Sequence, residues 1–189
     1  MTLTEKLNQF IDNLNGQFVE VSYKDAIYQC MDLAYAWVFC LDYPKATIQH
    51  QYAYEVFTSP NDLTRKYFDL ISNTPDFVPR DGDICVFKGG TAGHIAVCLG
   101  GGTTSKFWRF EQNNPLGTNA ALNERGYTNM LGVLRPKVFS NNETLIYEGL
   151  DLNNNESMKS AGTVAQASVK KICGVAISSA KKIIGVSNV

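Results

Sequence analysis

Residues 82–100, GDICVFKGGTAGHIAVCLG, decide the fold class of this chain. The stretch contains two short apolar runs, DICVF and HIAVCLG, which a loop with three glycines separates. Short apolar runs bounded by glycine-rich turns are typical of β-strands, and two strands joined by a short loop pair antiparallel. The segments SKFWRFEQ and NMLGVLRP have the same character further along the chain. We therefore predict an antiparallel sheet that extends to about Pro136.

Helical patterns precede these strands. Residues 2–15 are predicted to form a helix, because their apolar residues recur on one face and Thr2 and Glu5 have the spacing of a capping box. Residues 29–42 fit a buried helix with an apolar stripe. Helices followed by a run of strands predict an α+β domain, in which N-terminal helices pack on an antiparallel β-sheet.

Three other segments carry weaker signals. Residues 48–57 and 62–72 are predicted to be two further helices, the second with Asn61 as its N-cap. Residues 17–22, FVEVSY, alternate like a short strand or an extended lead-in to the buried helix. The chain shows no internal repeat.

The composition is that of an ordinary globular protein. The chain has 189 residues, 44% of them hydrophobic, and a formal net charge of −1, which gives no reason to expect nucleic-acid binding. The five cysteines form no CxxC pair and no zinc-ligand spacing, so we expect neither a disulfide framework nor a metal site. No secretory signal and no apolar run long enough to cross a bilayer are recognisable, which favours synthesis in a reducing cytosol.

The C-terminal part differs from the rest. Residues 1–137 are predicted to be the folded domain, and residues 138–163, rich in asparagine and serine, a linker. Residues 164–189 are predicted to form a basic amphipathic helix, with lysine pairs opposite an apolar stripe. Such a helix can lie on an anionic membrane, pack on a partner or mediate self-association, and the sequence leaves these alternatives open.

The candidate chemistry centres on Cys30. It lies at the predicted start of a helix, where the helix dipole favours the thiolate, the nucleophilic form of cysteine. An imidazole within hydrogen-bond reach is the other usual activator, and His94 opens a strand directly after the glycine-rich loop. Glu111 or Asn113, at the end of the next strand, would orient that imidazole. Gln29 could donate its amide to the oxyanion of a tetrahedral intermediate.

The same residues carry a resemblance to a known family. The blocks QCMDL, DGDICVF with GHIAV, and FEQN resemble, in this order, the CHAP domain, a cysteine, histidine-dependent amidohydrolase/peptidase. The resemblance covers residues 17–136 and implies a papain-like α+β fold. It places the nucleophile on Cys30, the general base on His94 and the orienting acid on Glu111, with Asn113 as the asparagine that accompanies the acid.

One part of the family pattern is missing. Many phage members carry a calcium loop of the form DxDGxYGxQC before the cysteine, whereas this chain has VSYKDAIYQC. Val21 and Tyr23 stand where carboxylates would be, and calcium needs six to eight oxygen ligands. We therefore expect no calcium site and no other cofactor.

The resemblance implies a peptidoglycan hydrolase that cuts an amide bond in the peptide part of the bacterial cell wall, as phage endolysins do. The bond would be a peptide bond or the muramoyl–alanine amide. Such a protein would be made in the host cytoplasm and act on the wall. An NlpC-type peptidase is the nearest alternative, although its DCSG motif is absent here. A non-catalytic wall-binding or interaction module on the same scaffold is the alternative from another class.

Overall fold

The computed structural model describes residues 1–21, 28–137, 171–172 and 175–176. The helices are α1 (Leu3–Leu14), α2 (Cys30–Cys40), the 3₁₀ helix η1 (Lys45–Ile48), α3 (Glu55–Thr58) and α4 (Asp62–Tyr67). The strands are β1 (Phe68–Ser72), β2 (Ile84–Phe87), β3 (His94–Cys98), β4 (Phe107–Glu111), β5 (Ala121–Arg125), β6 (Met130–Pro136), β7 (Lys171–Ile172) and β8 (Val175–Ala176). No helix in this described part is long and apolar enough to cross a membrane.

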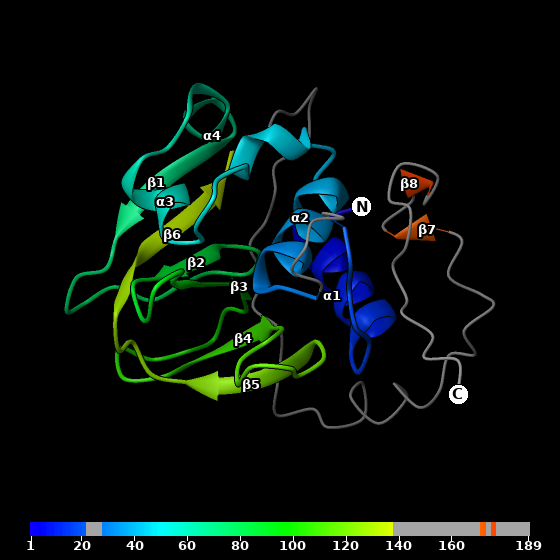
Figure 1. Cartoon of the computed structure of the whole chain (residues 1–189). Coiled ribbons are helices and arrows are strands. Elements are labelled where there is room, and N and C mark those ends of the chain that lie inside the picture. Colours follow the sequence, from blue (N-terminus) through cyan, green and yellow to red (C-terminus); the bar gives the residue numbers. More distant parts are fainter. Residues whose placement is uncertain (22–27, 138–170, 173–174, 177–189) are drawn as a thin grey trace.

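Strands β1 to β6 form one sheet with the order β1-β6-β2-β3-β4-β5, and every neighbouring pair is antiparallel. Helices α1 and α2 lie together beside this sheet, and α3 and α4 lie near its β1–β6 edge (Figure 1). The predicted α+β class, with N-terminal helices on an antiparallel sheet, is confirmed.

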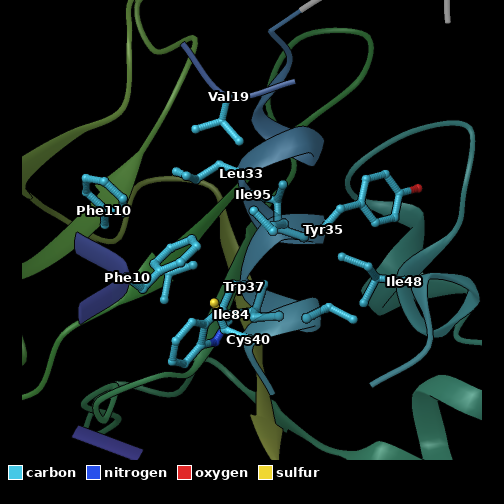
Figure 2. Packing of buried hydrophobic residues seen from close by; sticks show 14 of the residues in the cluster. Phe10, Val19, Leu33, Tyr35, Trp37, Cys40, Ile48, Ile84, Ile95 and Phe110 are labelled. Atoms are coloured by element: carbon cyan, nitrogen blue, oxygen red, sulfur yellow. The ribbon is translucent and has the colours of Figure 1, made fainter. Parts of the chain in front are cut away.

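The apolar faces of the helices and the sheet meet in one core. Phe10 of α1 contacts Trp37 of α2 at a ring-centroid distance of 5.1 Å and Phe110 of β4 at 5.7 Å. Figure 2 shows Leu33 and Trp37 of α2 together with Ile84 and Ile95 of the sheet, all of them buried. This packing fixes α2 against β3, and the residues that begin these two elements are Cys30 and His94.

The two long helices formed as the sequence predicts. The capping box of α1 is present, with the Glu5 N–H donating to Thr2 Oγ1 at 3.1 Å and the Thr2 N–H donating to Glu5 Oε2 at 2.8 Å. The four predicted strands correspond to β2, β3, β4 and β6. Asn61 caps α4 as expected, because its Oδ1 accepts a hydrogen bond from the Thr64 N–H at 2.8 Å.

Other predictions are wrong. Residues 68–72 were expected to continue a helix and instead form β1, whose backbone pairs with β6. Residues 48–57 contain the end of η1 and the short α3 rather than one helix. Of the two alternatives for residues 17–22, the short strand is not found at residues 17–21, the extended lead-in stays a prediction, and residue 22 lies outside the described residues.

The predicted tail helix is also corrected where the structure describes it. Lys171–Ile172 and Val175–Ala176 form the antiparallel pair β7–β8 instead of helix. The rest of residues 164–189 and the predicted linker lie outside the described residues, so the domain boundary stays a prediction. Cys40 is disulfide-bonded, although the cysteine spacing indicated no disulfide framework.

Candidate active site

The start of α2 is held by its own side chains. Gln29 is the N-cap, with an extended backbone, and Cys30 is the first helical residue. The Gln29 N–H donates to Asp32 Oδ2 at 2.8 Å, and the Asp32 N–H donates to the Gln29 carbonyl at 3.0 Å. The other oxygen of the buried Asp32 carboxylate accepts the Val21 N–H at 3.1 Å. These bonds satisfy N–H groups that a helix start leaves unpaired, and they fix the backbone around Cys30.

Gln112 connects this helix start to the sheet. It follows β4 directly and is fully buried. Its Oε1 accepts the Val19 N–H at 2.7 Å, and its Nε2 donates to the carbonyls of Val19 at 2.9 Å and Gln29 at 3.0 Å. The side-chain amide of Gln112 therefore joins the end of β4 to residues 17–21 and to Gln29, the residue before Cys30. Buried polar groups of this kind are costly to leave unpaired, so the network fixes one arrangement.

The structure brings Cys30, His94 and Glu111 together in a chain of contacts. His94 Nε2 lies 2.9 Å from Glu111 Oε2, and the His94 ring also hydrogen-bonds the Cys30 side chain. Because Nε2 is in contact with the carboxylate, we infer that Nδ1 is the ring nitrogen that interacts with the sulfur. The His94 side chain is 16% exposed and the Glu111 side chain is fully buried, whereas Cys30 is half-buried. A thiol, an imidazole and a carboxylate in this order form a nucleophile–base–orienter set.

Glu111 is surrounded by cations and donors. Its Oε1 accepts from Arg125 Nε at 3.2 Å, and its Oε2 accepts from Asn114 Nδ2 at 3.0 Å. Arg109 Nε lies 3.1 Å from Oε2, an ion pair by distance, but the direction of its N–H gives no hydrogen bond. Burial raises the pKa of Glu111, but the hydrogen bond from His94 and the charge of Arg109 outweigh it, so the pKa is lowered overall. The carboxylate is therefore charged at neutral pH.

The environment of His94 favours its protonated form. Burial lowers the pKa of His94, while its hydrogen bonds and charge interactions with Cys30 and Glu111 raise it to about 9. At neutral pH the ring therefore carries a positive charge next to the sulfur. An imidazolium beside a cysteine stabilises the thiolate, which is the state that a cysteine hydrolase needs.

Asn113 and Gln29 contact each other rather than His94. Asn113 Nδ2 donates to Gln29 Oε1 at 3.2 Å, and Asn113 Oδ1 accepts the Gly117 N–H at 2.6 Å. Of the two orienting groups that the sequence left open, Glu111 is therefore the one in contact with the imidazole. The asparagine on the carboxylate is Asn114, the neighbour of the residue that the family resemblance indicated.

Four residues of this site were not predicted. They are Arg109, Gln112, Asn114 and Arg125. Arg109 stands two positions before Glu111 on β4, so strand alternation places both on one face and could have indicated the pair. Gln112 and Arg125 carried no such signal, because their partners are distant backbone groups or lie on another strand, whereas Asn114 lies only three positions after its partner Glu111.

The part of the chain that the structure describes contains no cluster of three or more histidine, cysteine or acidic side chains able to hold a metal ion. Residues 22–27, which belong to the segment compared with the calcium loop, lie outside the described residues. The absence of a calcium site therefore stays a prediction.

Comparison with known proteins gives structural neighbours only. No family model and no curated protein matches the chain. Among solved structures it is similar to the wild-type endolysin LysIME-EF1, with 21% identity and a TM-score of 0.51 over 72% of this chain and 64% of that one. It is also similar to Ly7917, with 13% identity and a TM-score of 0.52 over 72% and 63% of the two chains. Ly7917 with the hydrolyzing product of MDP gives 15% identity and a TM-score of 0.53 over 71% and 63%. The chain thus spans less than two thirds of the length of these neighbours and shares the fold of these structures, which include that endolysin.

Proposed function

We propose that this chain is a cysteine-dependent peptidoglycan hydrolase of the CHAP type, which cuts an amide bond in the peptide part of the bacterial cell wall. The observation that carries the proposal is the contact chain from Cys30 through His94 to the buried Glu111. Each member has the environment that its role requires: a partly accessible sulfur, a positively charged ring and a buried carboxylate. The endolysin identity of the structural neighbour LysIME-EF1 supports the cell wall as the substrate and a phage endolysin as the biological role.

In the proposed reaction, the Cys30 thiolate attacks the carbonyl carbon of the scissile amide while His94 holds the proton that the thiol has given up. A carbon–sulfur bond forms, and the carbonyl oxygen becomes an oxyanion. The Gln29 and Asp32 N–H groups are already bonded, so the other backbone N–H groups at the start of α2 are the ones proposed to stabilise this oxygen, because a helix N-terminus directs N–H donors at negative charge. Gln29 Oε1 accepts a hydrogen bond from Asn113 Nδ2, and the amide N–H of the same side chain is the further donor proposed for the oxyanion.

His94 then gives its proton to the leaving amine, and the carbon–nitrogen bond breaks to leave a thioester on Cys30. Water, deprotonated by His94, attacks the thioester carbonyl, the carbon–sulfur bond breaks, and the acyl part leaves as a carboxylic acid, which returns the Cys30 thiolate and the protonated His94. Glu111 keeps the ring in one orientation through both steps, because its contact with Nε2 leaves Nδ1 directed at the sulfur. The proposal leaves two bonds open, a peptide bond of the stem or cross-bridge and the muramoyl–alanine amide.

Digestion of purified sacculi, followed by mass mapping of the fragments, tests this function. We expect new amino and carboxyl termini at a single type of amide bond with the wild-type protein and none with Cys30→Ala. Cys85→Ala is the matched control, because Cys85 is a free and fully buried cysteine on β2. Binding of sacculi without any new termini would favour the non-catalytic wall-binding module instead.

The reactivity of the thiols provides a second test. Iodoacetamide should alkylate Cys30 first, since Cys85 and Cys98 are buried in the sheet and Cys30 is not. Prior alkylation should abolish the release of fragments from sacculi. Fragment release that continues after Cys30 is fully modified would contradict the proposed role of the sulfur.

A further inference from the structure

A cavity of about 340 Å³ opens beside the imidazole of His94. Three loops form it: the turn between β2 and β3, the loop after β4, and the turn between β5 and β6. Its lining includes His94, Arg109, Asn113, Leu116 and Asn129. Ligand pockets in proteins begin at about 300 Å³, so this cavity has room for one residue of a substrate.

The charged groups in the lining are all positive. They are His94 and Arg109, and none of the carboxylates in the described part of the chain lines the cavity. Glu111, which balances both cations, is fully buried behind them and also pairs with Arg125. Arg109, Arg125 and His94 thus share the single carboxylate of Glu111. The cationic groups around this carboxylate outnumber it, and two of them, His94 and Arg109, line the cavity.

The guanidinium of Arg109 is held in a fixed position at the wall of the cavity. Its side chain is 8% exposed, and its guanidinium lies 4.5 Å from the ring centre of Phe87 and 5.9 Å from that of Phe107. Its buried Nε makes no hydrogen bond with any residue that the structure describes. A cation fixed between aromatic rings and lining a cavity needs little reordering when an anion arrives, which favours binding.

The outer part of the cavity is of a different character. Leu116, on the loop after β4, is 88% exposed and lines the rim. It provides a contact for the aliphatic stem of a residue whose charged end points inward.

The position of the cavity relative to the reacting atoms decides which part of a substrate it meets. In the proposed reaction His94 gives its proton to the leaving amine, so the portion of the substrate attached to that amine lies on the side of His94. The cavity is lined by His94 and not by Cys30. It therefore faces the leaving-group side of the scissile bond.

We propose that this cavity is a subsite for a carboxylate-bearing residue on the leaving-group side of the peptide substrate, with Arg109 as the main charge that it meets. This inference rests on the proposed hydrolase function and deepens it by naming a determinant of specificity. A free carboxylate on that residue should improve kcat/KM about tenfold over the matching carboxamide, since hydrogen bonds to charged groups are worth about one to two powers of ten.

The test uses two synthetic peptides built around the bond that fragment mapping identifies. They are identical except that the residue after the bond carries a free carboxylate in one and a carboxamide in the other. The variant Asn129→Asp adds a carboxylate to the lining at an exposed position with a positive φ of 61°, which aspartate tolerates. Asn8→Asp is the matched control, because it makes the same change of charge on α1, outside the lining of the cavity.

We expect the wild-type protein and Asn8→Asp to prefer the carboxylate peptide about tenfold and Asn129→Asp to lose this preference. The same order should appear in the binding of both peptides to Cys30→Ala, measured by calorimetry. Equal cleavage of both peptides by the wild-type protein, still dependent on Cys30, would overturn the subsite and leave the hydrolase intact. An equal loss of preference in the two charge variants would also overturn it. Failure to cleave sacculi or either peptide would count against the hydrolase itself.

Discussion

Replacing Glu111 with glutamine removes one negative charge from the centre of the site and keeps the size of the side chain. The carboxylate is fully buried and lies 2.9 Å from His94 Nε2. An opposite charge within about 4–6 Å moves a pKa by about 1–3 pH units. The contact with Cys30 remains in the variant, and burial still lowers the pKa of His94. We therefore expect E111Q to lower the pKa of His94 by about 1 to 2 pH units from its raised value.

This change has a defined effect on stability. The raised pKa of His94, from 6.5 to about 9, stabilises the folded wild-type protein fully below about pH 6.5, and this contribution is lost as the pH rises through about 9. Its size is about 3 kcal/mol, since each pH unit corresponds to about 1.4 kcal/mol. In E111Q the pKa of His94 is raised less, so the stabilisation from the protonated ring is smaller even at low pH. The difference in free energy of unfolding between the two proteins should therefore shrink by about 1.4 to 2.7 kcal/mol between pH 6 and pH 10.

The direct assay is the titration of the His94 ring by NMR in both proteins. His50 is the other histidine of the chain, and its resonance reports any general change in the fold. At alkaline pH the rate of sacculus digestion should fall as His94 loses its proton. In E111Q this fall should occur at a lower pH than in the wild-type protein, because the pKa of His94 is lower. Identical titration of His94 in the wild-type protein and E111Q would refute the view that Glu111 holds the imidazole.

Other predictions concern the backbone, the buried network and metal ions. Gly93→Ala should reduce both the melting temperature and the activity more than Gly90→Ala. Both glycines have a positive φ, but only at Gly93 would an added Cβ lie 2.5 Å from the Phe87 carbonyl oxygen. Equal losses would show that the close approach does not matter. Gln112→Leu should cost about 3 kcal/mol in chemical denaturation, because it leaves the buried N–H and carbonyl of Val19 unpaired. An unchanged midpoint would contradict that network. Activity on sacculi should be unaffected by a strong chelator, and a loss that calcium restores would reveal a calcium site.

The sequence was informative where the signals are local. Helix α1 could be predicted because its capping box and apolar stripe lie within one segment. Strands β2 and β3 could be predicted because a glycine-rich loop separates two apolar runs. Strand β1 could not, since it continues directly from α4 and its pairing partner β6 lies far along the chain. Strand β5 is mostly half-exposed at the edge of the sheet, and its mixed polar sequence gives no clear alternation.

The same distinction holds for the candidate site. Cys30, His94 and Glu111 were recognisable because each has a distinctive residue type at a marked place: a helix start, a strand start and a strand end. The contacts that fix them were not recognisable. Gln112 acts on backbone groups of residues that precede α2, and Arg125 reaches Glu111 from the neighbouring strand. Such contacts depend on the three-dimensional register and leave no mark in the local sequence.

Release of free amino groups from purified sacculi by Cys30→Ala, with Cys85→Ala as the control, tests the central mechanism most directly. Removal of a catalytic nucleophile lowers the rate by at least about a thousandfold, so the first variant should release almost none while the second retains the wild-type rate. Release by Cys30→Ala at a rate close to that of the wild-type protein would contradict the mechanism, whatever the arrangement of the neighbouring histidine and carboxylate.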